Sequence, residues 1–142
     1  MYKVLLAIRP DDAEVMRRIL GDEFEVLACV SLAKAQAALT PTMDMIACGV
    51  HFDDGRMSDL HKFAKADSAL SPIPFWGVLR DNGALSTAIT RSIRTAMKTM
   101  GANGLFNLSQ IASGIDEDAA FRELRTALQK SLAEKDRAAD QP

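Results

Sequence analysis

The sequence lacks any long apolar run. No stretch approaches the ~18 to 20 apolar residues of a membrane-spanning helix. The first residues, MYKVLLAIRPDD, have an apolar core of only five residues and no small-residue cleavage site. We therefore expect a soluble, cytoplasmic protein with no membrane segment.

Cysteine is nearly absent, and so are glycine motifs that bind phosphate. Only Cys29 and Cys48 occur, each inside an apolar run rather than at a disulfide or zinc spacing, which predicts buried, reduced thiols. No Gly-x-Gly-x-x-Gly and no phosphate loop follows a strand-like segment, which weighs against dinucleotide and nucleoside triphosphate ligands. The net charge is only −2, so composition points neither to nucleic acid nor to an anionic membrane.

What the sequence does contain is a regular alternation of apolar strand-like runs and amphipathic helical segments. The expected strands cover residues 3–8, 24–30, 43–50, 71–79 and 104–108. The expected helices cover residues 11–20, 32–40, a segment after residue 58, 83–100 and 116–135. Parallel strands joined by right-handed crossovers form a three-layer α/β sandwich. Because the second strand is typical of an edge strand, we predict a five-stranded parallel sheet in the flavodoxin-like order 2-1-3-4-5.

Helix starts and buried faces are predicted at particular residues. Asp11 precedes Glu14 by three positions, so Asp11 is expected to cap the first helix. In the third helix, Leu60 and Phe63 are expected on the buried face and His61 at the surface.

Three stretches carry a resemblance to a known family. They are MDMIACGVHFDDGRMSDLHKFAK (43–65), IPFWGVL (73–79) and MGANGLFNL (100–108). The chain resembles the receiver (CheY-like) domains of bacterial two-component response regulators over about residues 3–135. We accordingly expect a single receiver-like domain from 1 to 135, followed by a polar, disordered tail at 136–142.

The resemblance implies phosphoryl transfer to an aspartate at the end of the third strand. In the family, Mg²⁺ is held by an acidic pair after the first strand, and a Ser or Thr after the fourth strand and a Lys after the fifth engage the phosphoryl group. Here the phosphoacceptor position falls on Gly49 and the acidic pair on Arg9 and Pro10, while Leu79 and Leu108 take the hydroxyl and lysine positions. The resemblance therefore implies a degenerate pseudo-receiver, which is not an enzyme, needs no cofactor and signals by protein–protein contact.

Two other hypotheses stay open at this point. Asp11, Asp12 and Asp53 are expected at one end of the sheet and could hold Mg²⁺, with Asp53, Asp54 or Asp11 as a displaced phosphoacceptor. The alternative for these residues is helix capping and turn chemistry.

The other open hypothesis is a small-molecule sensor that uses the crevice at the strand ends. The residues expected around that crevice are Arg9, Gly49, His51, Arg80 and Asn107. His51 does not complete a cobalamin motif, because Gly49 stands at its Asp position, so we expect an exposed loop histidine.

A basic stripe follows the fourth helix. Arg91, Arg94 and Lys98 recur at spacings of three and four, and Arg80 lies near the start of this segment. A solvated helix face would show the same pattern, but we expect a surface for a protein partner. Homodimerisation stays open, and nucleic acid is not expected.

Trp76 is predicted to lie in the core.

Overall fold

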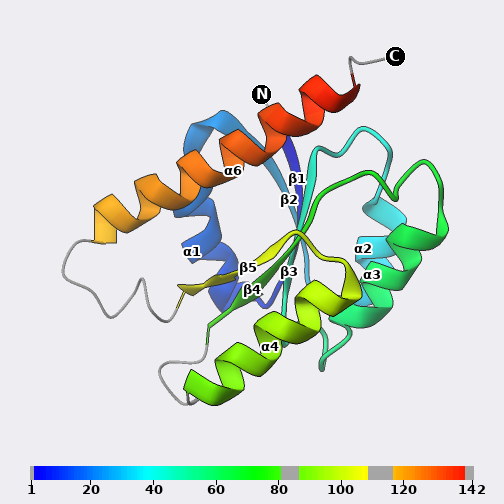
Figure 1. The fold of residues 1–142 in the computed structure, drawn as a ribbon. Helices are drawn as coiled ribbons and strands as arrows, with labels where there is room; N and C mark the ends of the chain where they lie inside the picture. Colours follow the sequence, from blue (N-terminus) through cyan, green and yellow to red (C-terminus); the bar gives the residue numbers. More distant parts are fainter. Residues whose placement is uncertain (1, 81–86, 109–116, 140–142) are drawn as a thin grey trace.

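Alternating strands and helices build the protein, and the computed structural model describes residues 2–80, 87–108 and 117–139 (Figure 1). The strands are β1 (Tyr2–Ala7), β2 (Phe24–Cys29), β3 (Met45–Gly49), β4 (Phe75–Leu79) and β5 (Gly104–Asn107). The helices are α1 (Pro10–Leu20), the 3-10 turn η1 (Gly21–Glu23), α2 (Leu32–Ala38), α3 (Met57–Ala66), α4 (Thr87–Met100) and α6 (Glu117–Ala139).

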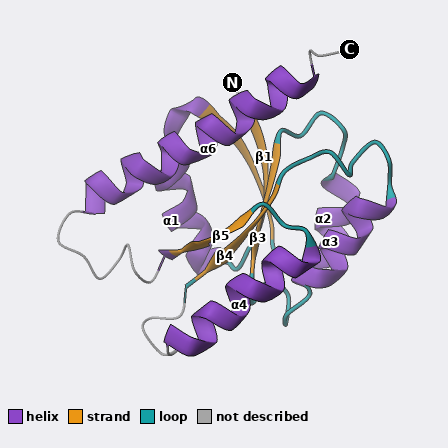
Figure 2. Cartoon of the chain, in the orientation of Figure 1, coloured by secondary structure: helices purple, strands orange, loops and turns teal. Residues whose placement is uncertain are grey.

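The five strands form one parallel sheet in the order β2-β1-β3-β4-β5, which confirms the predicted flavodoxin-like topology. Helices α2, α3 and α4 cover one face of the sheet, and α1 and α6 cover the other (Figure 2). In such sheets the carboxyl ends of the strands meet at one edge, where ligand sites usually form. Arg9, Gly49 and Arg80 all lie at that edge.

Apolar side chains fill the space between the sheet and both helical layers. All five residues of β3 are buried, as expected for a central parallel strand. The two cysteines are free and buried, and burial raises the pKa of both thiols. Trp76 is partly buried in the core cluster under α1 and α6, where its ring stacks on Phe106 with centroids 4.4 Å apart.

Several predicted boundaries need correction. Asp11 does not cap α1, because the helix begins at Pro10 and its N-cap residue is Arg9. Proline suits the first helical position, since its missing N–H would have no partner there. Helix α6 continues to Ala139, so residues 136–139 are helical rather than a disordered tail. Residues 83–86 of the predicted fourth helix and residues 140–142 of the predicted tail lie outside the described residues.

The buried face of α3 also differs from the prediction. His61 is buried with 4% of its surface exposed, whereas Phe63 is 38% exposed. The buried residues of the helix are Met57, Leu60, His61 and Ala64, which follow the spacing i, i+3, i+4, i+7. The histidine therefore completes the buried stripe, and the phenylalanine lies off it.

Among the described residues, no helix is both long and apolar enough to cross a lipid bilayer.

Candidate functional site

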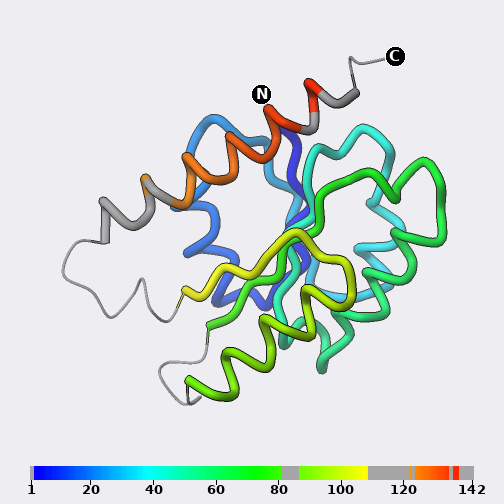
Figure 3. The backbone as a smooth tube through the Cα atoms, in the orientation of Figure 1, coloured from blue at the N-terminus to red at the C-terminus, as the bar shows by residue number. Residues whose placement is uncertain are grey.

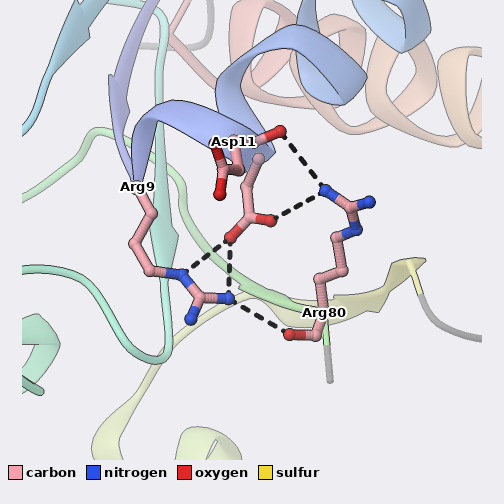
Figure 4. A network of polar contacts seen from close by, with 4 residues as sticks. Arg9, Asp11 and Arg80 are labelled. Atoms are coloured by element: carbon pink, nitrogen blue, oxygen red, sulfur yellow. Dashed lines mark hydrogen bonds and ion pairs between the residues drawn. The ribbon is translucent and has the colours of Figure 1, made fainter. Parts of the chain in front are cut away.

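A buried carboxylate marks the strand-end edge of the sheet. Asp12, in the first turn of α1, is only 5% exposed. The Nε and Nη2 atoms of Arg9 lie 3.1 and 3.0 Å from Oδ2 of Asp12. The Nη1 atom of Arg80, which directly follows β4, lies 3.3 Å from Oδ1. We call Arg9, Asp12 and Arg80 the arginine clamp (Figure 4).

The two arginines also bind main-chain oxygens. Arg9 Nη2 donates to the carbonyl of Arg80, just after β4, at 3.2 Å. Arg80 Nη1 donates to the carbonyl of Asp11, in the first turn of α1, at 3.3 Å. Each arginine therefore binds the carboxylate and a main-chain oxygen of the other segment (Figure 4). As a result, the start of α1 is fastened to the end of β4.

The charges of the clamp explain how Asp12 can be buried. A desolvated carboxylate without partners costs several kcal/mol, and paired guanidiniums offset that penalty. The arginine side chains stay 46% and 32% exposed, so their own desolvation is modest. Two guanidinium groups face one carboxylate, which leaves the clamp with an excess of positive charge.

These residues do not fit a magnesium ion. Mg²⁺ needs free carboxylate oxygens in near-octahedral geometry, and each oxygen of Asp12 already accepts a hydrogen bond from a guanidinium. In the part of the chain that the structure describes, no group of three or more His, Cys, Asp or Glu side chains lies close enough together to hold a metal. The guanidiniums thus take the place beside Asp12 that a bound cation would need.

Gly49 ends β3 next to this cluster. A Cβ atom built on Gly49 would lie 3.4 Å from Cγ1 of Ile8 and 3.7 Å from the amide nitrogen of Phe52, which are ordinary van der Waals distances. The position to which the resemblance assigns the phosphoacceptor therefore lacks a nucleophile because its residue is glycine, not because space is short.

Asp53 has a structural task in the loop after β3. Its Oδ2 accepts a hydrogen bond from the amide of Leu32, the first residue of α2, at 2.8 Å. Asp53 and Asp54 have φ angles of 44° and 57°, and Gly55 continues the turn at 86°. Aspartate tolerates this left-handed backbone better than most residues. Of the carboxylates predicted to hold a metal, Asp12 lies in the clamp and Asp53 binds the start of α2, while Asp11 is exposed.

The remaining predicted crevice residues lie at the same edge in different environments. His51 is exposed, which agrees with the prediction of a loop histidine. Leu79 and Leu108 are buried in the apolar core, on opposite faces of the sheet. Asn107 is 8% exposed.

Sequence reasoning missed His61 as a buried group. Its ring lies edge-on to Phe75, with centroids 4.9 Å apart and an angle of 85° between the planes. Nε2 is buried and has no hydrogen-bond partner among the residues that the structure describes. Burial, and then the charge of Lys65, lower the pKa of His61. The signal was present in the sequence as the i, i+3, i+4, i+7 spacing of Met57, Leu60, His61 and Ala64.

The basic stripe is exposed on α4 and borders a groove. Arg91, Arg94 and Lys98 are all exposed, and within the described ranges no carboxylate lies within ion-pair distance of them. Arg80 does not belong to this stripe, because its guanidinium is held in the clamp. The groove between α4 and β5 has a volume of about 410 Å³ and is bordered by Arg94 and Lys98.

Comparison with known proteins supports the fold. No family model matches the chain, and no curated relative matches it. The structure is similar to a response regulator of Chloroflexus aurantiacus with 21% identity and a TM-score of 0.65, over 93% of this chain and 98% of the other. It is also similar to the receiver domain of a sensor histidine kinase from Pseudomonas aeruginosa, with 14% identity and a TM-score of 0.65, over 93% and 98% of the two chains. That domain has a magnesium ion coordinated in its active-site cleft. The fold is therefore that of receiver domains, at identities that show fold alone.

Proposed function

We propose that this chain is a receiver-like signalling protein that works without aspartyl phosphorylation and acts through contact with a protein partner. The observation that carries the proposal is the arginine clamp, in which two guanidiniums neutralise the buried carboxylate of Asp12. In this view the protein is not an enzyme.

The chemistry of aspartyl phosphorylation supports the proposal. Phosphoryl transfer to a carboxylate needs a positioned nucleophile and a cation that offsets charge on the transferring oxygens. Gly49 has no side chain and therefore supplies no nucleophile. Asp53, the nearby acidic alternative, uses a carboxylate oxygen to hold the first amide of α2. The ion pairs of Arg9 and Arg80 with Asp12 use the carboxylate oxygens that a metal site would need.

Without a phosphorylation step, any regulation has to come from the partner or from another ligand. A ligand shifts a conformational equilibrium only through different affinities for the two states. Here the clamp ties the loop before α1 to the end of β4 in the unmodified protein. We infer that the protein keeps one conformation without modification, and that the exposed basic face of α4 contacts the partner in this conformation.

The test is an amide NMR titration of the full chain with Mg²⁺, then with Mg²⁺ plus beryllofluoride, a mimic of an aspartyl phosphate. We expect the amides of residues 49–55 to keep their positions at millimolar Mg²⁺ and after beryllofluoride. Shifts that saturate in both steps and vanish in Asp53→Asn would overturn the proposal and establish an atypical receiver. The matched control is Asp54→Asn, which removes the same charge from the exposed neighbouring residue.

A further inference from the structure

The two edge strands of the sheet are protected to different degrees. β5 has only four residues, and Arg94 Nη1 donates to the carbonyl of its Leu105 at 3.2 Å. β2 has six residues and pairs with β1 in an uninterrupted register from Phe24 to Cys29. It contains no proline, lysine or arginine, and its one charged residue is Glu25. Short length, bulges, prolines and lysines are the usual means of keeping an edge strand from pairing. β2 therefore lacks the features that prevent pairing with another strand.

The main-chain groups of β2 point alternately to β1 and away from the sheet. The amide of Ile8 donates to the carbonyl of Cys29 at 3.1 Å, so the groups of Cys29 point to β1. Because these groups alternate along a strand, those of Val26 and Ala28 point outwards. Among the described residues, β2 pairs with no strand but β1, and no turn or loop hydrogen bond uses the groups of Val26 or Ala28. The chain leads from η1 through β2 to α2 along the outside of β1, with donors and acceptors for one more strand (Figure 3).

Two large apolar side chains are exposed beside this outer edge of β2. Leu27, in the middle of the strand, is 45% exposed, and Val30, directly after it, is 48% exposed. Leu27 lies on the same face of the sheet as Cys29, which packs in the core cluster together with α2. The exposed residues of α2 are Ala33, Lys34 and Ala37. A strand that approaches β2 on this face therefore meets an exposed leucine, a lysine and small alanine side chains.

The sequence of β2 fits a second copy of itself. In an antiparallel pair of β2 strands, outward-pointing groups meet each other when the two-fold axis passes through a residue. An axis at Leu27 pairs Val26 with Ala28 of the partner subunit and places the two exposed leucines against each other. An axis at Glu25 would instead bring two carboxylates together. The axis at Leu27 thus gives apolar contact at the centre without like charges opposite each other.

The same register matches opposite charges. It places each Glu25 opposite Cys29 of the partner subunit. Burial raises the pKa of the Cys29 thiol and the charge of Lys34 lowers it, which puts the Lys34 ammonium near that thiol. Within one chain, Glu25 and Cys29 are about 13 Å apart along the strand, at ~3.3 Å per residue. Glu25 and Lys34 are both exposed, and in the described ranges neither makes an ion pair. Each glutamate therefore meets a lysine of the other copy.

We propose that this protein forms a symmetric homodimer in which the β2 strands of two copies pair antiparallel about a two-fold axis at Leu27, so that the two sheets join into one. The contact comprises one strand and its flanks, so the dimer is weak and depends on protein concentration. The surface is separate from the basic stripe of α4. The inference therefore goes beyond the proposed function and leaves the face proposed for the partner uncovered.

The first test is sedimentation equilibrium of the full chain from micromolar to millimolar concentration. We expect the mass to rise from that of one chain towards that of two. Leu27→Asp places two carboxylates at the axis and should weaken dimerisation roughly tenfold or more. Ile89→Asp is the matched control, because Ile89 is 47% exposed but lies on α4. A chain that stays monomeric throughout, or an equal loss in Ile89→Asp, would overturn the proposal.

Cross-linking tests the register in variants that keep the strand intact. The background is Cys29→Ala, in which the remaining Cys48 is fully buried. Leu27→Cys puts two thiols on opposite residues of a non-hydrogen-bonded pair, whose Cα atoms lie about 4.5 Å apart, within the range of a disulfide. Glu25→Cys puts them about 13 Å apart along the strands. Mild oxidation should link the first variant and not the second. The opposite result, or no link in Leu27→Cys, contradicts the proposed pairing.

A charge exchange tests the contact between the copies. Glu25→Lys and Lys34→Glu should each weaken the dimer a few-fold, and the double variant should recover it. No recovery would rule out the pairing of Glu25 with Lys34. The outcome is independent of the phosphorylation test, because a monomeric chain whose residues 49–55 ignore Mg²⁺ and beryllofluoride would refute the dimer and leave the proposed function standing.

Discussion

Helices α3 and α4 cover the same face of the sheet but are attached to it very differently. Helix α3 buries Met57, Leu60, His61 and Ala64 within its ten residues, whereas α4 buries only Met97 within its fourteen. Both have an apolar stripe in the sequence. The difference lies in what packs against each helix. Helix α3 contacts α2 and, through His61, Phe75 of β4, whereas α4 lies along the edge strand β5 (Figure 1). An amphipathic pattern therefore predicts a helix, but the elements that pack against it decide how much of the stripe is buried.

The largest expected difference between the helices comes from truncating one side chain in each. Leu60→Ala removes a fully buried side chain of α3, and large-to-small core changes of this kind cost about 2–5 kcal/mol. Ile89→Ala truncates a half-exposed residue of α4, and we expect a change within about 0.5 kcal/mol. Urea unfolding of both variants measures the contrast. Similar losses in the two would show that α4 is as much part of the core as α3.

A second pair of variants tests how firmly α4 is packed against the sheet. On Gly104 a Cβ atom would lie 2.3 Å from the ring of Trp76, and on Gly77 it would lie 2.6 Å from the terminal methyl of Met97. An aromatic ring stacked on Phe106 cannot move easily, so Gly104→Ala should cost about 1–3 kcal/mol as overpacking. Gly77→Ala should cost less, because the methionine is flexible and α4 can shift. Unfolding free energies check the order. The reverse order would mean that Met97 is held as firmly as Trp76.

The fold was predictable because its signals are local and repeated. Five apolar runs separated by amphipathic segments allow few arrangements, and the edge character of β2 selected the observed order. Predictions failed where two neighbouring residues could fill the same role. Both Arg9 and Asp11 could precede the first turn of α1, and the helix begins at Pro10 because proline suits the first helical position. In α3 either His61 or Phe63 could have joined the buried stripe, and the helical spacing of the buried residues includes His61.

The sequence predicted where the candidate site lies but not how its side chains pair. Gly49, Leu79 and Leu108 occupy positions where the resemblance implies reactive side chains. Arg9, Asp12 and Arg80 were expected at the strand-end edge, but the ion pairs of the clamp were not predicted. Arg9 and Arg80 are 71 residues apart and meet only after β1 and β4 have joined the same sheet, so spacing along the chain does not show which side chains pair.

The clamp offers a smaller test of how the start of α1 is held to the end of β4. Arg80→Ala leaves Asp12 with Arg9 alone and removes the bond to the Asp11 carbonyl. Because Arg80 is partly exposed, we expect a loss of only about 1 kcal/mol. Hydrogen exchange should accelerate in α1 and α4 while α3 stays protected. Arg56→Ala is the matched control, since the ion pair of Arg56 with Asp59 is exposed on both sides. Faster exchange throughout α3 in Arg80→Ala would contradict the localised role.

The smallest expected effect concerns the one polar residue in the buried stripe of α3. The pKa of His61 is lowered in the folded protein by burial and by Lys65, whereas the unfolded chain titrates near the ordinary value of 6.5. Below that pH the unfolded state binds more protons than the folded state. The free energy of unfolding should therefore be unaffected by this group above about pH 7 and fall as the pH drops through 6.5 towards the folded pKa. Urea unfolding between pH 7.5 and 5.5 measures the slope, which His61→Phe should reduce. An equal slope in His61→Phe would mean that the buried histidine of α3 does not cause the pH dependence.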